Sequence, residues 1–433
     1  MAFAVVSAVA YLRIMTGDVA LLLRRAGFGP TAAELAAAQQ SGYERTVSAL
    51  VAPVGPDVGA TDAPIPVLGL DPFARLLTPT PAQTERAHAQ RRVQLESISR
   101  WWLDRMVVAS HQAVERLQFF WQGHWATKLG SAQLMLGQHR ALRGSRDFVD
   151  MAHRMVNDRA LVYWLDGQHN KKNAPNENLA RELFELFVLG IGQYTEKDIK
   201  EAARTLTGYR VVLDKDALVF DPQHHDNGRK TILGTTADFD PHSLVDLLVK
   251  QRACPRFIAT RMWYRYASSS EPIPERVRES MAAAFPKPMA MLRVLFEDDA
   301  FQATRGTMVK QPVEWFVGAL RQLGLRPVRL KPEVFTRLYW ALESLGQRPF
   351  APPSVGGWPA GTAWLTSAAA NVKLAMAKQL ADLVAPSRMT PEDVAYILCV
   401  DKWTDRTYAV LRGERDARLL LTLGLVSPEY QVT

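Results

Sequence analysis

Two glutamates, Glu182 and Glu185, stand three positions apart in a segment that is otherwise mostly apolar. The segment, residues 175–187, reads PNENLARELFELF, and Gly190 follows shortly after it. Asparagine favours the start of a helix and glycine the position just after its end, so the segment predicts a helix between Asn176 and Gly190. Residues three apart lie on the same side of a helix, which places the two carboxylates close together.

The polar residues of this predicted helix share one narrow stripe, because apolar side chains cover more than half of its circumference at about 100° per residue. The stripe holds Asn178, Glu182 and Glu185, with Arg181 and Glu177 beside it. In a cavity, one carboxylate would raise the pKa of the other, as acid–base catalysis requires. In solvent, Arg181 would instead pair with Glu177 and Glu185. Glu182 and Glu185 are candidate catalytic residues; Asn178 and Arg181 are candidate substrate-binding residues.

A histidine lies within a block of aromatic residues and is the third candidate catalytic residue. The block, residues 119–127, reads FFWQGHWAT and places His124 three residues after Trp121. Histidine serves as a base, as a metal ligand or as a buried hydrogen-bonding residue. The aromatic surroundings of His124 favour the buried role, and the other two stay open.

A polar segment farther along the chain, His224 to Gly228, brings histidine and aspartate together in a predicted loop. Adjacent side chains point in different directions, so one histidine at most serves a given site. His225 and Asp226 are candidate substrate-binding residues, because such a pair binds a metal ion or an anion. The same residues also suit a simple turn in which the aspartate bonds to its own backbone.

Tryptophans on a rigid loop are candidate platforms for a planar or sugar ligand. Residues 349–361 read PFAPPSVGGWPAG, and the prolines fix the path of the loop while its glycines allow close approach of a neighbour. We expect Trp358, Trp364 and Trp121 either to bind substrate in this way or to fill the core.

The elements that must position these residues are predicted to be almost all helical. Capping boxes are expected at Thr31 with Glu34 and at Thr195 with Asp198, and a helix break is expected near Ser110. Residues 52–80 form a predicted Pro/Gly-rich loop. Residues 209–234 form a predicted insertion that begins with a β-hairpin over 209–220. The prediction is an all-α, bundle-like single domain, residues 1–433, with this small β insertion.

Composition excludes several classes of protein. Hydrophobic residues make up 48% of the chain and charged residues 22%, as in an ordinary globular protein. Its two cysteines, Cys254 and Cys399, lie far apart, so neither a disulfide scaffold nor a thiolate metal site is expected. Motifs for dinucleotide binding, for a P-loop, for zinc proteases and for α/β-hydrolases are not found.

The net charge of +8 raises the question of a nucleic-acid partner. The densest basic stretch interleaves five cations with aromatic residues, namely Lys250, Arg252, Arg256, Arg261 and Arg265 with Trp263, Tyr264 and Tyr266. Such a stretch suits a nucleic-acid groove, but it equally suits a helix with a cationic solvent face and an aromatic core face. We expect the second arrangement and no specific nucleic-acid partner.

The first fifteen residues, Met1 to Met15, are apolar but have no basic region ahead of the apolar run. They are too short to span a bilayer, and no other stretch is long and apolar enough. The prediction is a soluble cytoplasmic protein without a membrane span; a secreted protein is the alternative if these residues form a degenerate signal peptide.

Six strings and a tail resemble a bacterial family known as domain of unknown function 1800. They are LLRRAGFG at 22–29, FWxxH at 120–124, PNENxARELxELF at 175–187, YTExD at 194–198, HDxGxKTxLG at 225–234, PFxPPxVGGW at 349–358 and SPEYQ at 427–431. The aromatic block of the family usually reads FWHNH, whereas Gln122 and Gly123 stand here at its first histidine and its asparagine. The resemblance implies no reaction, but it directs attention to the glutamates, His124, His225 with Asp226, and Trp358 as one convergent site.

The leading hypothesis is therefore an enzyme that uses a carboxylate and histidine pocket for acid–base hydrolysis or elimination on a small-molecule or glycan-like substrate. A metal-dependent variant would use Glu182, Glu185, His225 and Asp226 as ligands. The alternatives are a metal- or haem-binding protein and a non-catalytic accessory or binding protein, in which the same residues form buried polar struts. The cofactor and the oligomeric state stay open.

Overall fold

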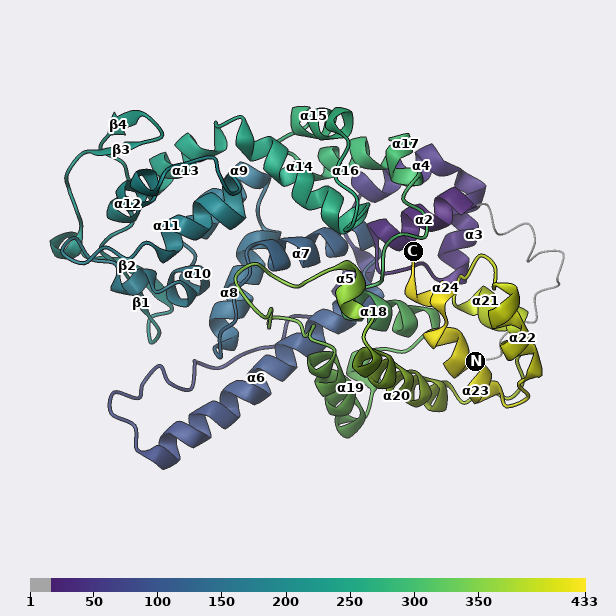
Figure 1. Ribbon diagram of the computed structural model, residues 1–433. Helices are drawn as coiled ribbons and strands as arrows, with labels where there is room; N and C mark the ends of the chain where they lie inside the picture. Colours follow the sequence, from purple (N-terminus) through teal and green to yellow (C-terminus); the bar gives the residue numbers. More distant parts are fainter. Residues whose placement is uncertain (1–16) are drawn as a thin grey trace.

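Helices make up most of residues 17–433, which are the residues that the computed structural model describes (Figure 1). Within this part of the chain, strands form two small antiparallel sheets of two strands each. The predicted fold class, predominantly helical with a small β insertion, is confirmed. The apolar segment Met1 to Met15, for which a degenerate signal peptide was the alternative interpretation, lies outside the described residues.

A first hydrophobic core is built by helices from the N-terminal and central parts of the chain. Trp121, Phe187 and Tyr266 are among its buried side chains. The helices that contribute are α2 (Gly17–Ala26), α4 (Tyr43–Val51), α7 (Gln112–His124), α9 (Phe148–Val156), α10 (Arg159–Trp164), α11 (Asn178–Glu182), the π-helix η2 (Leu183–Val188), α12 (Glu196–Thr205), α13 (Pro241–Val249), α14 (Ala253–Tyr266), α15 (Glu275–Ala283), α16 (Pro288–Phe296) and α17 (Asp299–Gln302).

A second core lies between the long helix α6 and the C-terminal helices. Trp102, Trp315 and Trp358 are buried in it. Its helices are α6 (Pro81–Val108), α8 (Ala132–Arg143), α18 (Pro312–Gln322), α19 (Pro332–Ser344), α20 (Ser367–Val384), α21 (Pro391–Ile397), α22 (Asp405–Gly413), α23 (Ala417–Val426) and α24 (Pro428–Gln431). Helix α7 faces both cores, because Trp121 packs into the first and Phe119 into the second.

Short elements complete the fold. They are α3 (Ala32–Ser41), α5 (Val58–Thr61) and the 3-10 turns η1 (Gly167–His169), η3 (Pro222–His224), η4 (Pro327–Arg329) and η5 (Gly361–Trp364). Both predicted capping boxes are present, at Thr31 with Glu34 before α3 and at Thr195 with Asp198 before α12. The predicted break near Ser110 separates α6 from α7.

The predicted hairpin is present, and a second hairpin follows it. Strand β1 (Tyr209–Val212) pairs with β2 (Ala217–Phe220), so that Tyr209 faces Phe220. Strand β3 (Lys230–Ile232) pairs with β4 (Thr235–Ala237), which extends the β region three residues past the predicted end at 234. Sequence patterns did not indicate β3 and β4, because three-residue strands are too short to show alternation.

The predicted loop over 52–80 folds back along α6 and contains the one-turn helix α5. Arg91 on α6 holds it by an ion pair to Asp71, with 2.7 Å between the nitrogen and the oxygen. The N-terminal half of α6 and this loop extend away from the rest of the molecule (Figure 1). None of the helices described for residues 17–433 is both long and apolar enough to cross a membrane.

Candidate functional site

The helix that carries the two glutamates changes its backbone geometry halfway along. Residues Asn178–Glu182 are α-helical, and Leu183–Val188 form a π-helix in which the Leu189 amide bonds to the carbonyl of Phe184, five residues earlier. The Asn176 side chain accepts the Asn178 N–H at the start, and Gly190 ends the helix with a φ of 85°. A π-helical turn inside a helix is rare and frequently marks a functional site.

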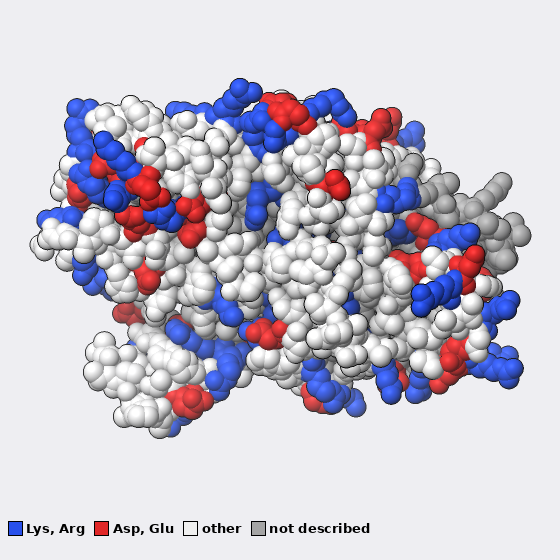
Figure 2. All heavy atoms as spheres, viewed as in Figure 1, with Lys and Arg blue, Asp and Glu red and all other residues white. Residues whose placement is uncertain are grey.

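The burial of this helix follows the predicted stripe. Its apolar side chains are buried except for Leu186, which is partly buried; the buried ones are Leu179, Ala180, Leu183, Phe184, Phe187 and Val188. Glu182, Glu185 and Arg181 are partly buried, and Asn178 is exposed. Figure 2 shows acidic and basic side chains interleaved on the surface over α11 and α12. The stripe therefore reaches the surface while most of the helix lies in the first core.

Arg181 holds three carboxylates around the stripe. Its guanidinium lies 2.9 Å from Glu177, 3.4 Å from Glu185 and 2.7 Å from Glu196, the first residue of α12. The pairs with Glu177 and Glu185 are those expected one helical turn away. Glu196 was not predicted as a partner, because sequence spacing does not show contacts between separate helices.

Glu182 is set apart from the other acids of the stripe. Within residues 17–433 its carboxylate makes no hydrogen bond and no ion pair, whereas Glu185 is paired with Arg181 and also hydrogen-bonded by Tyr194. Burial raises the pKa of Glu182, and the nearby negative charge of Glu185 raises it further. Burial and the bond to Glu185 raise the pKa of Tyr194 as well, so its hydroxyl stays a donor. The Tyr194 contact was not predicted, because sequence spacing shows only that Tyr194 lies in the turn before α12.

His124 lies in the first core and not beside the glutamates. It is 2% exposed, and its Nε2 atom lies 2.9 Å from the main-chain oxygen of Phe187. Burial lowers its pKa to about 3, and the positive charges of Arg261 and Arg265 contribute to this shift. The ring is thus neutral near pH 7 and supports the π-helix from its buried side. The predicted role as a proton-transfer partner has no contact to support it.

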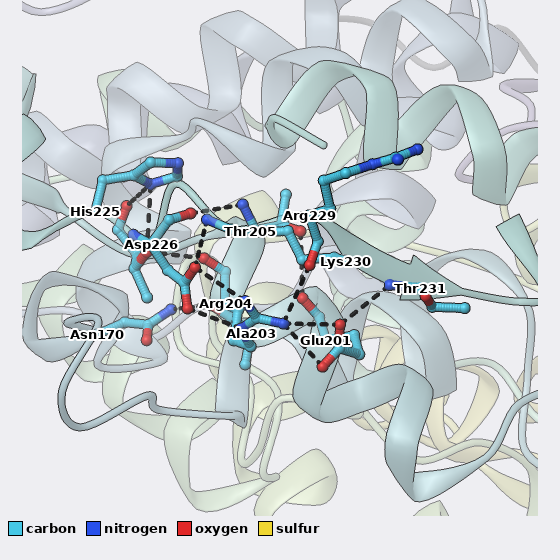
Figure 3. Close-up of polar contacts among 12 residues, drawn as sticks. Asn170, Glu201, Ala203, Arg204, Thr205, His225, Asp226, Arg229, Lys230 and Thr231 are labelled. Atoms are coloured by element: carbon cyan, nitrogen blue, oxygen red, sulfur yellow. Dashed lines mark hydrogen bonds and ion pairs between the residues drawn. The ribbon is translucent and has the colours of Figure 1, made fainter. Parts of the chain in front are cut away.

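His225 and Asp226 anchor a loop to the end of α12. Figure 3 shows Arg204 between Asp226 on one side and Glu201 on the other. The Asp226 carboxylate lies 2.7 Å from the Arg204 Nε atom and also accepts the Gly228 N–H at 2.9 Å. His225 Nδ1 lies 2.9 Å from the main-chain oxygen of Thr207. The bond from the Gly228 amide is the one that the turn interpretation predicts, whereas the contacts with Arg204 and Thr207 attach the loop to α12 and the residues after it.

The predicted site residues occupy three separate environments. Arg181 contacts Glu196 at the start of α12, whereas Asp226 contacts Arg204 near its end, eight residues and about 12 Å farther along the helix. Among the residues that the structure describes, no hydrogen bond or ion pair joins Glu182 or Glu185 to His124, His225 or Asp226. A single convergent site at all of these positions stays a prediction without a contact to support it.

The three candidate tryptophans are buried and do not present a free ring face at the surface. Trp121, Trp358 and Trp364 are 2%, 3% and 4% exposed. Trp358 stacks on Phe119 with 5.2 Å between ring centroids, and Trp121 borders a cavity of about 230 Å³ that Arg143 also lines. Core packing therefore accounts for Trp358 and Trp364.

The loop that carries Trp358 touches the aromatic block of α7 where the block departs from the family pattern. A Cβ on Gly123 would lie 3.2 Å from the Trp358 ring, and one on Gly357 would lie 2.2 Å from the Gly123 carbonyl oxygen. Gln122, in place of the first histidine, is buried and donates to the Gln138 side chain at 2.9 Å. Gly123 therefore allows the close contact with the loop that carries Trp358, and Gln122 forms a buried amide pair with Gln138.

The basic and aromatic stretch does not form an open groove. Arg265, Trp263 and Tyr266 on α14 are buried, and Arg265 donates to the main-chain oxygens of Trp358 and Pro359. Arg256 pairs with Glu275 at 2.9 Å. Trp263 and Tyr266 lie in the core as expected, whereas Arg265, which was expected on the solvent face, is buried as well.

Metal ligands do not gather in groups of three anywhere in residues 17–433: no three His, Cys, Asp or Glu side chains there are arranged to hold a metal ion. Glu182, Glu185, His225 and Asp226 therefore form no ready-made metal centre. Cys254 and Cys399 are free and buried.

The family model described as protein of unknown function (DUF1800) matches residues 21–432, nearly the whole chain, and the chain belongs to this family. No curated protein and no solved structure matches the chain.

Proposed function

We propose that this chain is an acid–base enzyme whose reacting groups are Glu182 and Glu185. The observation that carries the proposal is the contrast between the two carboxylates: Glu185 has Arg181 and Tyr194 as partners, and Glu182 has none within residues 17–433. Two neighbouring carboxyl groups whose surroundings separate their pKa values are the usual basis for an acid and a base in one site.

In this mechanism Glu182 is the group that gives and takes the proton. Its raised pKa keeps a larger protonated fraction near neutral pH than an ordinary glutamate has, which suits a general acid. Glu185, paired with Arg181, stabilises positive charge that develops on the substrate and contributes to the raised pKa of Glu182. Arg181, Tyr194 and His124 are positioning residues, and Asn178 is the exposed candidate for binding substrate.

The substrate class that we propose is a hydroxyl-bearing one such as a glycan, because hydrolysis of a glycosidic bond uses two carboxyl groups in different protonation states. The tryptophans no longer add support to this class, since Trp358 and Trp364 pack in the core. The proposed glycan substrate class therefore rests on the two carboxylates, Glu182 and Glu185.

Turnover of a panel of nitrophenyl glycosides and soluble polysaccharides by the full-length protein tests this function. We expect Glu182→Gln to lower turnover about a hundredfold or more, as loss of a general acid does, and Glu185→Gln to lower it as well. The matched control is Glu333→Gln, which changes an exposed glutamate on α19. Turnover that is equal in the wild type and Glu182→Gln would refute the proposed role, and no turnover on the whole panel would remove the glycan class.

A second candidate function is a non-catalytic accessory protein in which the same residues brace two helices. The observation in its favour is that Arg181 contacts carboxylates from both α12 and its own helix. Unfolding experiments on this network separate the two functions, because a brace contributes to stability whereas a catalytic carboxylate pair opposes it.

A further inference from the structure

Two histidines from different helices face each other on the surface, away from the glutamate stripe. His153 on α9 and His242 on α13 have their Nδ1 atoms 3.1 Å apart, and their ring centroids are 5.3 Å apart. Apolar residues on the inner sides of both helices, such as Met155 and Leu244, are buried in the first core. The separation of the two rings is therefore set by helix packing.

The other ring nitrogen of each histidine already has a partner. His153 Nε2 lies 3.0 Å from an Asp246 oxygen, and His242 Nε2 lies 3.2 Å from the Asn157 side-chain amide. A carboxylate only accepts hydrogen bonds, so Nε2 of His153 carries the proton and the lone pair of a neutral ring is on Nδ1. That lone pair points toward His242.

We propose that His153 and His242 bind a divalent transition-metal ion through their Nδ1 atoms. Two imidazole nitrogens on a tetrahedral zinc ion, each at 2.0–2.1 Å, are about 3.3 Å apart, close to the 3.1 Å observed. The pair needs to open by only a few tenths of an ångström. A small displacement of each ring is enough.

The surroundings supply the second shell that such a site uses. Asp246 accepts the Nε2 proton of His153, as carboxylates do behind metal-bound histidines, and thereby orients the ring. The Asn157 amide nitrogen donates to Nε2 of His242, so the proton of this ring lies on Nδ1 when no metal is bound. On metal binding that proton moves to Nε2, and a half-turn of the Asn157 amide presents the oxygen to it; the two ends of an amide have nearly the same shape. Asp246 lies one turn after His242 on α13, so one helix supplies a ligand and a second-shell group.

The ligand set selects the kind of ion. Imidazole nitrogens suit Zn²⁺, Ni²⁺ and Cu²⁺, whereas Mg²⁺ and Ca²⁺ require oxygen ligands. His242 and Asp246 are exposed, so water completes the coordination. The nearby cation Arg154 is paired with Asp150 at 3.0 Å, which offsets its repulsion of the ion. With two protein ligands, this site is expected to bind the ion more weakly than a structural zinc site, which has four.

Calorimetric titration of the untagged full-length protein with Zn²⁺ and with Ni²⁺ tests the proposal. We expect one ion per chain in the wild type. His153→Ala and His242→Ala should each weaken binding at least tenfold, and Asp246→Asn should weaken it by about tenfold through the second shell. The matched control is His169→Ala, which removes an exposed histidine elsewhere and should leave the affinity unchanged.

Two results would overturn the site. One is binding of either ion by His153→Ala and His242→Ala with the affinity of the wild type, and the other is no binding by the wild type at millimolar ion. Circular dichroism establishes that the variants are folded, and the exposure of His242 makes His242→Ala the safer of the two. Electron paramagnetic resonance with Cu²⁺ gives a second readout: two coordinated nitrogens are expected in the wild type and one in His242→Ala.

Discussion

The Nε2 atom of His124 lies 2.9 Å from the main-chain oxygen of Phe187, inside the π-helix that also carries Glu185. This bond joins the C-terminal end of α7 to the wide turn of the glutamate helix. A buried carbonyl oxygen without a donor has lost its hydrogen bond to water and has none in the protein, which destabilises the folded state. The histidine therefore supports the geometry of the stripe from the side that faces the core.

Replacing His124 by phenylalanine is expected to destabilise the protein by about 1–3 kcal/mol, the cost of leaving a buried acceptor unsatisfied. The substitution preserves an aromatic ring among Phe120, Trp121 and Phe187 but removes the donor. Urea unfolding at pH 7.5 measures the change. A variant as stable as the wild type would show that the bond to Phe187 contributes nothing. The control His169→Phe, at an exposed position, should change little.

The same histidine should make stability fall with acid. Its pKa is about 3 in the folded protein, below the ordinary value of 6.5, so the unfolded chain binds the proton more tightly. The stability that the neutral His124 ring contributes is fully present above pH 6.5 and is lost as the pH falls toward 3. The free energy of unfolding should drop by up to about 1.4 kcal/mol per pH unit in this window. His124→Phe should lack this component; parallel pH profiles of the two proteins would contradict the assignment.

The contact between Gly357 and Gly123 is expected to tolerate no side chain. Gly357 has a φ of 84°, which costs an ordinary residue about 1–2 kcal/mol, and its Cβ would lie 2.2 Å from the Gly123 oxygen. Gly357→Ala should therefore be clearly more destabilising than Gly192→Ala, a glycine with the same φ of 84° and no neighbour within 4 Å. Equal melting temperatures for the two variants would show that the loop can move away.

Local signals in the sequence predicted local structure well. The capping boxes at Thr31 and Thr195 and the hairpin over 209–220 were predicted correctly, because the residues that form them are neighbours in the chain. The β3–β4 hairpin was missed because a distant contact helps to hold it: the Leu233 amide donates to Asp198 at 2.7 Å. The π-helix was missed because it changes backbone bonding without changing the order of apolar and polar residues.

The candidate site could be predicted only in part for the same reason. The pairs of Arg181 with Glu177 and Glu185 follow from helical spacing, whereas the contacts with Glu196 and Tyr194 depend on how α12 packs. Aromatic residues gave the least reliable signal. Tryptophan is equally suited to a core and to a ligand platform, and only the tertiary structure shows that Trp358 is buried.

Arg181→Met is expected to cost about 1 kcal/mol or somewhat more, because partly exposed ion pairs are each worth at most about that much. The Arg181 side chain is 31% exposed, so solvent screens its pairs, and the loss should shrink in 1 M salt. Arg92→Met is the control, because the ion pair of Arg92 with Glu85 lies on the surface, with both side chains at least 60% exposed. A loss of several kcal/mol that salt does not reduce would favour the brace over the enzyme.

Glu182→Gln is expected to raise the melting temperature at pH 8 and to leave it unchanged at pH 4. The pKa of Glu182 is raised in the folded protein, so the folded state holds the proton more tightly than the unfolded chain does. The wild type therefore loses stability as the pH rises above the ordinary value of 4.5, and glutamine, which cannot ionise, avoids that loss. Calorimetric scans of both proteins at the two pH values measure the difference. Removing a brace would have the opposite effect and lower the melting temperature at pH 8. A carboxylate that weakens the fold at pH 8 needs a role other than stability, and proton transfer is the role that we propose.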